Sequence, residues 1–130
     1  MINDTLSDML VRIKNAQTMG KKQVDVVDSK LNRSVCDVLV DEGFVESYDA
    51  IKVEEKPFLK INLKYYMNKP VIQMLKRVSK SSLRVYKKCR DVPKIIDGFG
   101  VMVMSTPKGV MSHLKAREAN LGGEALFIIN

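Results

Sequence analysis

The sequence contains no tryptophan, one histidine and two cysteines among its 130 residues, and only 6% of its residues are aromatic. One histidine excludes a catalytic histidine pair, and two cysteines supply neither a disulfide framework nor the four ligands of a structural zinc site. No hydrophobic run approaches the roughly 20 residues of a membrane-spanning helix, and the acidic start lacks the apolar stretch of a secretion signal. We therefore expect a protein of a reducing compartment that uses no metal, cofactor or membrane.

Positive charge is distributed unevenly along the chain. Lys and Arg outnumber Asp and Glu by 22 to 15, which gives a formal net charge of +7. Residues 60–94 hold 11 of these cations and one acid, whereas residues 1–59 carry a net charge of −3 and residues 95–130 are neutral. Like charges repel one another, so the natural partner is a polyanion, whose neutralised phosphates release counterions. The alternative is a surface that only favours solubility, although such surfaces usually mix both signs.

The hydrophobic pattern of the first half changes from a helical to a strand period. Apolar residues three and four positions apart mark two amphipathic helices, and Ser29 and Gly43 are suited to cap the second. Apolar and polar residues then alternate, as in a strand with one buried face. Residues 54–57 form the predicted turn between the last two strands. We expect, in order, a helix over 5–17, a strand over 24–27, a helix over 29–42, a bulged strand over 44–53 and a strand over 58–66.

The second half is predicted to be mostly β and to follow a break at Asn68-Lys69-Pro70. The expected elements are strands over 71–78, 83–87, 101–104 and 125–129 and one short helix that ends near residue 119. The predicted fold class is therefore α+β, with two small lobes. The N-terminal lobe, residues 1–68, is a helix–strand–helix–hairpin unit, and the C-terminal lobe, residues 69–130, is mostly β.

The segment Ser105-Thr106-Pro107-Lys108-Gly109 follows a predicted strand and lacks the spacing of a nucleotide-binding loop. Two hydroxyls, a proline suited to the first helical position and a lysine predict a helix N-terminus, whose free N–H groups favour phosphate. An ordinary Thr-Pro helix cap is the alternative. Nearby, Gly122 and Gly123 would let another backbone approach closely. The Glu124 carboxylate would either accept a hydrogen bond from a base amino group or 2′-hydroxyl, or pair with a neighbouring lysine.

Residues 77–88 combine cations and hydroxyls with one aromatic side chain. Arg84, Lys87 and Lys88 are suited to contact phosphate, and Tyr86 is suited to stack on a base or to hydrogen-bond to the backbone. A protein that binds single strands by serial stacking would carry more aromatics, so we favour recognition of a folded RNA helix by its shape. The remaining reactive side chains are interpreted as packing or incidental residues: Cys36, Cys89 and His113.

Several motifs, taken together, resemble a known family. In order they are Asp4-x-x-x-Asp8-Met9-Leu10-x-Arg12-Ile13-Lys14-Asn15-Ala16, Glu42-Gly43-Phe44, Arg77-Val78-Ser79-Lys80, Arg84-Val85-Tyr86, Ser105-Thr106-x-Lys108-Gly109-Val110-Met111 and Gly122-Gly123-Glu124. Across essentially the whole chain this order resembles the bacterial-type small-subunit ribosomal protein S-eight family. The resemblance implies two α+β lobes and a protein with no catalytic activity and no small-molecule substrate. It also implies direct binding to the central domain of small-subunit rRNA, a role in subunit assembly and contact with neighbouring ribosomal proteins in a cytoplasmic or organellar ribosome.

The resemblance also implies which residues bind RNA. The first helix would contribute Asp4, Arg12 and Asn15. The main surface would lie in the C-terminal lobe, with Tyr86, Ser105, Thr106, Lys108, Gly122, Gly123 and Glu124. We add as candidates Pro107, which lies within this motif, and the phosphate-binding candidates Arg84, Lys87 and Lys88. The chain departs from the family pattern at Pro107, where a third hydroxyl is usual, at Ser81-Ser82, where Pro-Gly is usual, at Leu83, where a basic residue is usual, and in lacking a terminal aromatic.

Other functions remain open at the level of the sequence. The basic middle third alone permits a general nucleic-acid-binding module, for DNA as well as RNA. Members of the resembled family also repress their own mRNA by mimicry of the rRNA site, which makes translational repression an alternative. An RNA-modifying enzyme would need a histidine pair, a nucleophile motif or a dinucleotide loop, and the sequence contains none of these.

Overall fold

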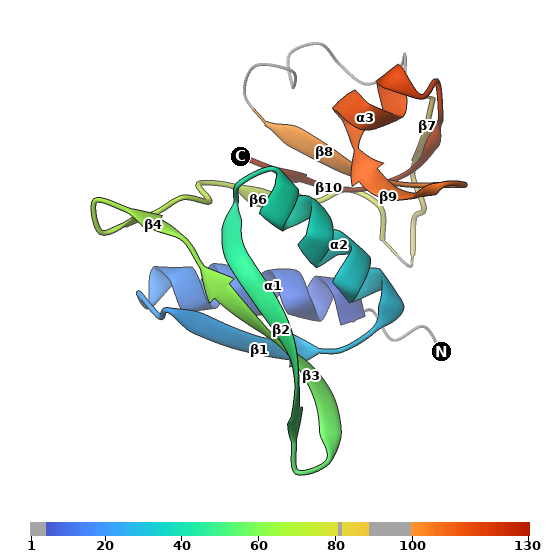
Figure 1. The fold of residues 1–130 in the computed structure, drawn as a ribbon. Coiled ribbons are helices and arrows are strands. Elements are labelled where there is room, and N and C mark those ends of the chain that lie inside the picture. The colour runs from blue at the N-terminus through green and yellow to red at the C-terminus, as the bar shows by residue number, and fades with distance from the viewer. Residues whose placement is uncertain (1–4, 81, 89–99) are drawn as a thin grey trace. The chain divides into compact units, whose positions relative to one another are not determined.

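The computed structural model describes residues 5–80, 82–88 and 100–130. Contacts within the chain divide it into two compact units, Met1–Ile72 and Gln73–Asn130. Helices and antiparallel sheets are present in both units, so the fold class is α+β, as the sequence predicted (Figure 1). The division falls slightly beyond the lobe boundary expected at residue 68.

The first unit consists of two helices packed on a three-stranded antiparallel sheet with the strand order β1-β3-β2. Leu59, Ile61 and Leu63 alternate with more exposed residues along β3 and belong to the core, together with the apolar stripes of both helices. Each predicted element is present within a few residues of its expected bounds. The elements are α1 (Thr5–Thr18), β1 (Gln23–Val27), α2 (Lys30–Asp41), β2 (Val45–Val53), β3 (Lys56–Leu63), β4 (Tyr65–Tyr66) and β5 (Lys69–Pro70).

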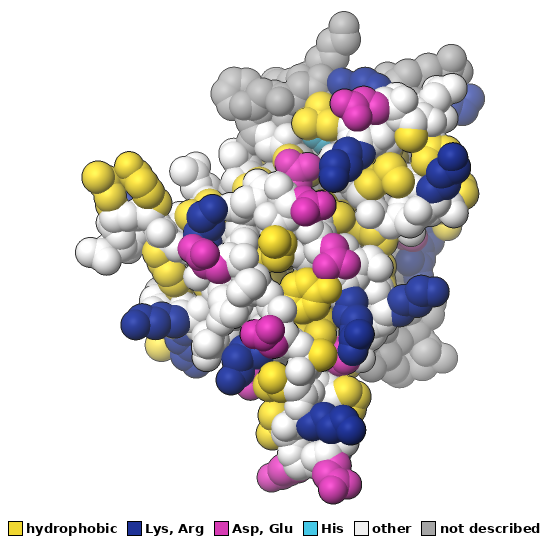
Figure 2. Space-filling view, viewed as in Figure 1, with side chains coloured by type: hydrophobic (Ala, Val, Ile, Leu, Met, Phe, Trp, Pro, Cys, Tyr) yellow, Lys and Arg dark blue, Asp and Glu magenta, His cyan; other side chains and the backbone are white. Residues whose placement is uncertain are grey.

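The turn between β2 and β3 is tighter than the sequence predicted. Only Glu54 and Glu55 form it, with φ values of 51° and 65°, which is typical of the two-residue hairpin turns that match strand twist. Pro57 suggested a longer turn, because proline has no N–H to donate to a neighbouring strand. It nevertheless lies in β3, at a position where β3 pairs with β2 but not yet with β1, whose pairing begins at Phe58. The predicted bulge in β2 is confirmed by a register shift between Val45 and Ser47. Figure 2 shows one face of the molecule, on which basic and acidic side chains are interspersed over α2 and this hairpin.

The predicted strand over residues 58–66 is interrupted after Leu63, and the predicted break that follows it is a hairpin. β4 and β5 pair with each other as a separate two-stranded ladder. Met67 and Asn68 connect them with φ values of 52° and 65°. The alternating pattern runs through Tyr65 without a gap, so the sequence carried no signal for the interruption.

The second unit is built around β10 (Gly123–Ile129). This strand pairs with β8 (Val101–Thr106) along one edge and with β6 (Leu75–Arg77) and then β7 (Tyr86–Lys87) along the other. β9 (Gly109–Ser112) adds to the outer edge of β8, and α3 (His113–Glu118) packs against β8. The predicted strands over 71–78 and 83–87 are thus shortened to β6 and β7, because these segments pair with only part of β10. One buried hydrophobic cluster of this unit consists of Met102, Met104, Ala116 and Ala125.

Two of the reactive side chains are packing residues, as interpreted from the sequence. Cys36 is fully buried with its Sγ 3.9 Å from Sδ of Met9, and burial, with the nearby charge of Asp37, raises the pKa of its thiol to about 12. His113 is also fully buried, and its Nδ1 accepts a hydrogen bond of 3.0 Å from the Met102 N–H. Cys89 lies outside the described residues. Over the described ranges, no helix combines the length and hydropathy needed to cross a membrane.

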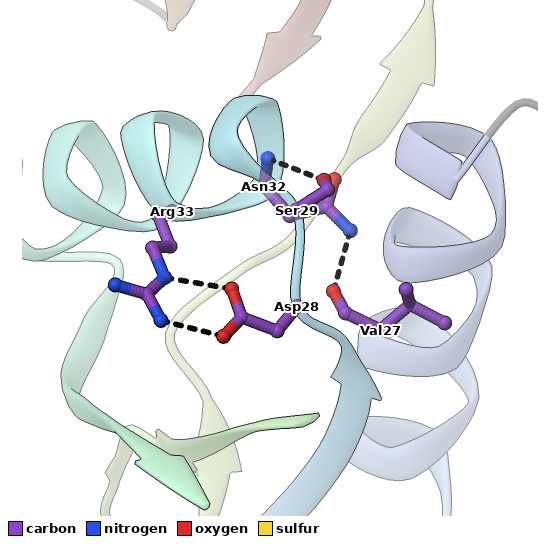
Figure 3. A network of polar contacts seen from close by, with 5 residues as sticks. All are labelled: Val27, Asp28, Ser29, Asn32 and Arg33. Carbon is purple, nitrogen blue, oxygen red and sulfur yellow. Dashed lines mark hydrogen bonds and ion pairs between the residues drawn. The ribbon is translucent and has the colours of Figure 1, made fainter. Parts of the chain in front are cut away.

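A polar network fixes the beginning of α2 (Figure 3). The Ser29 hydroxyl accepts a hydrogen bond of 3.1 Å from the Asn32 N–H, which confirms the predicted N-cap. The Asn32 side chain donates to the carbonyl of Val27 at 3.0 Å and so ties the helix to the end of β1. Arg33 donates two hydrogen bonds of 2.6 Å to the carboxylate of Asp28, and these lower the pKa of Asp28 against the opposing effect of burial.

We predict that Ser29→Ala lowers the free energy of unfolding by about 1 kcal/mol, because the Asn32 N–H then loses its acceptor at the helix start. Urea denaturation of the parent and the variant measures the difference. Ser29→Asp is the matched control, since its carboxylate keeps an acceptor at the same position and should retain most of the stability. Equal unfolding free energies for Ser29→Ala and the parent would contradict the assignment of this cap.

Candidate nucleic-acid interface

Three of the predicted site residues lie side by side across the sheet of the second unit. Glu124 in β10 is paired with Tyr86 in β7 on one side and with Ser105 in β8 on the other. Residues directly opposite each other in antiparallel strands place their side chains on the same face. Tyr86 is 70% exposed, and Ser105 and Glu124 are half-buried. The sheet therefore presents an aromatic ring, a carboxylate and a hydroxyl in one row.

This row lines a cleft of about 650 Å³. All eight of the described residues that line it are ones that the sequence singled out as RNA-binding candidates. Because the cleft combines two lysines, an aromatic ring, a hydroxyl and a single carboxylate, it offers a ligand both positive charge and directional hydrogen bonds. The residues are Tyr86, Lys87, Lys88, Ser105, Pro107, Gly122, Gly123 and Glu124.

The two glycines allow the strands beside the cleft to approach β10 closely. A Cβ at Gly123 would lie 2.1 Å from the carbonyl oxygen of Ser105, and one at Gly122 would lie 2.9 Å from that of Lys87. Both distances are too short for two non-bonded heavy atoms, and both neighbours are backbone atoms that cannot move away by rotating a side chain. The predicted close approach of another backbone is thus confirmed, and it occurs on both edges of β10.

The segment from Ser105 to Gly109 is a β-hairpin turn, which corrects the helix N-terminus expected from the sequence. β8 continues through Thr106 and β9 begins at Gly109, so the exposed Pro107 and Lys108 form the tip. The Thr106 hydroxyl donates to the Gly109 carbonyl at 2.7 Å and accepts from the Lys108 N–H at 3.3 Å. Thr106 is itself buried, and both of these hydrogen bonds stabilise the turn.

The error in this segment has a local cause. A hydroxyl followed by proline suits the start of a helix, but it also suits the start of a turn. Gly109 has a φ of 123°, which only glycine adopts without strain, and the residues after it pair with β8. The helix starts later, at His113, with the Ser112 hydroxyl accepting from the Lys115 N–H at 3.2 Å.

Glu124 is held by Ser79 and Arg84, whereas the sequence left a neighbouring lysine as one of two alternatives for its partner. Arg84 Nη1 donates to Glu124 Oε2 at 2.9 Å, and the Ser79 hydroxyl donates to the same oxygen. Burial, the largest effect, raises the pKa of Glu124, but these two hydrogen bonds and the charges of Arg84 and Arg77 outweigh it, so its pKa lies below the ordinary value of 4.5. Arg84, expected to contact phosphate, thus pairs with an acid of its own chain in this structure.

Ser79 is the residue that sequence reasoning missed. Ser79 belongs to the motif Arg77-Val78-Ser79-Lys80. A serine between two short predicted strands is common in a turn, so its type and position in the sequence indicate no functional role. Its burial and its bond to Glu124 come from the pairing of distant segments, which no local pattern reveals.

The candidates on the first helix lie in the other unit. Arg12 and Asn15 are exposed on the face of α1 opposite the core, and Arg12 Nε forms an ion pair with Asp8 at 2.9 Å. Both line a cleft of about 480 Å³ between α1, β1 and β3, whose other polar side chains include Lys21 and Lys60. Asp4, the third candidate, lies outside the described residues. Within the described part of the chain, no group of three or more His, Cys, Asp or Glu side chains is arranged to hold a metal ion.

We predict that Gly123→Ala lowers the free energy of unfolding by roughly 2 kcal/mol, since the added methyl group overlaps the Ser105 carbonyl and must displace a paired strand. The φ of Gly123 is one that alanine also adopts, so the cost arises from this contact alone. Gly122→Ala is the graded control, with a longer contact and a smaller loss. Denaturant unfolding checks both, and a Gly123→Ala protein as stable as the parent would contradict the observed spacing.

The lowered pKa of Glu124 predicts a pH dependence of stability. A carboxyl whose pKa is lower in the folded state stabilises the fold above its unfolded value, and this contribution is lost as pH falls below about 4.5 and through the folded value. The difference in unfolding free energy between the parent and Glu124→Gln should therefore be largest above about pH 5 and shrink on acidification. If this difference in unfolding free energy stayed constant or grew as the pH was lowered from about 6 to about 3, the assignment would be contradicted.

Comparison with known proteins agrees with the motifs. Residues 4–129 match the family described as ribosomal protein S8. The chain is 47% identical over 128 residues to the small ribosomal subunit protein uS8 of Laribacter hongkongensis, a match that covers 98% of both chains. It is 51% identical over 129 residues to the uS8 protein of Ruegeria pomeroyi, covering 98% of this chain and 99% of that one. The chain therefore belongs to the ribosomal protein S8 family, whose members are structural proteins of the ribosome and not enzymes, as the resemblance of its motifs predicted.

Proposed function

We propose that this protein binds the central domain of small-subunit rRNA directly and supports assembly of the small ribosomal subunit. The observation that carries the proposal is the convergence on one cleft of the second unit of eight predicted residues from three separate segments of the chain. Family membership supports a place in the small subunit, because relatives that match over nearly the full length are small ribosomal subunit proteins. In that setting the protein also contacts neighbouring ribosomal proteins.

The cleft is suited to a folded RNA helix. Such a helix is recognised by its shape, its phosphates and its 2′-hydroxyls, and less by its base sequence. The Ser105 hydroxyl donates to and accepts from a 2′-hydroxyl or a base edge, and the exposed Tyr86 ring stacks or contacts a ribose. Lys88 and Lys108 have exposed side chains that reach phosphate oxygens. Of the described residues that line the cleft, only Glu124 repels the phosphates, and a bound helix must therefore offer it a hydrogen-bond donor.

Attraction and selection are divided between different residues. Lys76, Lys80 and Lys88 are exposed on the second unit, and their charges attract any polyanion with a strong dependence on salt. The uncharged groups of the cleft and Glu124 act only at contact, where they distinguish one helix from another. We propose a further rRNA contact at Arg12 and Asn15 of the first unit, whose cleft also includes Lys21 and Lys60.

We predict that Ser105→Ala or Glu124→Ala weakens binding to the cognate rRNA helix by about 1–3 kcal/mol, because a buried polar group of the complex loses its partner. Binding of Ser105→Ala to a random duplex RNA of equal length should stay the same, since that binding depends on charge. Glu124→Ala should bind the random duplex no more weakly than the parent, because a carboxylate that repels the phosphates is removed. Titration of both RNAs with each variant at one salt concentration measures the difference. Equal losses on both RNAs would show that these residues do not select the helix.

Lys88→Ala is the contrasting variant. It should weaken binding to both RNAs about equally and reduce the slope of log affinity against log salt by about one, as expected for one lost phosphate contact. Duplex DNA is the competitor that separates the proposed function from a general nucleic-acid-binding module. If the parent binds DNA or random RNA as tightly as the rRNA helix, and does not co-sediment with small subunits, the proposal fails.

A further inference from the structure

Ser79 is fully buried, and its position is fixed on both sides by the backbone. Its N–H donates to the carbonyl of Ala125 at 3.0 Å, and the N–H of Ala125 donates to the carbonyl of Val85 at 2.9 Å. The segment from Ser79 to Val85 is therefore attached to β10 at the residue next to Glu124. A serine held in this way cannot turn its hydroxyl to water.

The hydrogen bonds of Ser79 orient its single hydroxyl proton. The Val85 N–H donates to Ser79 Oγ at 3.1 Å and occupies one of its acceptor positions. Within the described part of the chain its other hydrogen-bond partner is Glu124 Oε2, to which the proton is therefore directed. A hydroxyl that accepts on one side and donates on the other is a rigid donor.

Arg84 supplies a second donor to the same carboxylate oxygen. Its Nη1 lies 2.9 Å from Glu124 Oε2, so both donors converge on Oε2. Neither of these two hydrogen bonds involves Oε1. Glu124 lines the cleft, whereas Ser79 and Arg84 are absent from the described residues that line it. The carboxylate is thus held through one oxygen by groups outside the cleft.

We propose that Ser79 and Arg84 are positioning residues that hold Glu124 through Oε2 and leave Oε1 as a fixed acceptor for an N–H or O–H donor of the bound RNA. This inference rests on the proposed function of the cleft and adds the means by which the acid is oriented. A free glutamate side chain would lose rotamer entropy on binding, and an already oriented one loses less. The charge of Arg84 also offsets the repulsion between the carboxylate and the phosphates.

A purely structural role for Ser79 predicts a different result. Ser79→Ala also removes the acceptor of the Val85 N–H, so a loss of stability alone supports neither role. The two roles differ in whether the effect on RNA binding requires Glu124. A double-mutant cycle with Ser79→Ala and Glu124→Ala separates them, because residues that act through one another have non-additive effects.

In the full-length protein, we expect Ser79→Ala to weaken binding to the cognate rRNA helix by about tenfold and to leave binding to random duplex RNA unchanged. In the Glu124→Ala background, Ser79→Ala should have no further effect. Ser79→Thr keeps the hydroxyl and should restore most of the affinity. Ser112→Ala is the matched control: it removes a buried serine hydroxyl of the same unit that bonds to Lys115, so it should reduce stability without reducing discrimination between the RNAs.

Arg84→Ala gives a second cycle if Ser79→Ala does not fold, since Arg84 is exposed. A carboxylate NMR titration is the second readout: either variant should move the pKa of Glu124 upward, toward its ordinary value. Single 2′-deoxy substitutions and inosine for guanine in the RNA identify the donor as a 2′-hydroxyl or a base amino group. The inference would be overturned, and the proposed function kept, by one set of results. In it the effects of the paired substitutions on RNA binding are additive, the pKa of Glu124 is the same in the variants as in the parent, and the parent still prefers its rRNA helix. Loss of that preference in the parent would instead overturn the proposed function and this inference with it.

Discussion

The close approach of three backbones at Gly122 and Gly123 is the constraint on which the candidate interface depends. Because neither glycine has a side chain, β7 and β8 can pair with β10 on both of its edges at the same point. This pairing places Tyr86 and Ser105 beside Glu124, although the three residues are separated by many positions in the sequence. A methyl group at Gly123 would push the Ser105 strand away, and the row of side chains would separate. The close packing of the three backbones is therefore what brings the side chains of the cleft together.

The charges of the second unit have two roles. Exposed lysines attract a polyanion at a distance, whereas Arg84 is engaged by Glu124 within the chain. An acid beside phosphates is unfavourable unless its charge is offset and its remaining oxygen finds a donor. The ion pair with Arg84 offsets the charge of Glu124, and the hydrogen bond from Ser79 helps to orient its carboxylate. Under the proposed function, attraction of the RNA and selection among RNA helices would then depend on different residues.

Much of the fold was predictable because local patterns agree with the tertiary structure. Three short-range patterns predicted the local structure that the folded protein has. They are the apolar stripes of α1 and α2, the Ser29 cap and the alternation along β3. The errors arose where one local pattern fits two structures. Thr106-Pro107 suits both a helix start and a turn, and Pro57 suggested a longer turn because proline is disfavoured in paired strands. In both cases the outcome depended on a neighbouring strand that the local sequence does not reveal.

The sequence by itself determined the α+β class, the concentration of positive charge in the middle third and the family. Composition, hydrophobic period and motif order can be read along the chain and do not depend on which segments meet in the fold. Its motifs, through the family that they resemble, and its basic segment also singled out in advance the eight described residues that line the cleft. Only the tertiary structure decided that Tyr86, Glu124 and Ser105 form one row, that the loop after β8 is a hairpin and that the buried Ser79 holds Glu124. These facts depend on strand register and on contacts between segments that are 45 residues apart in the case of Ser79 and Glu124. Hydrogen bonds of that range form only when the backbone has folded, so no local pattern contains them.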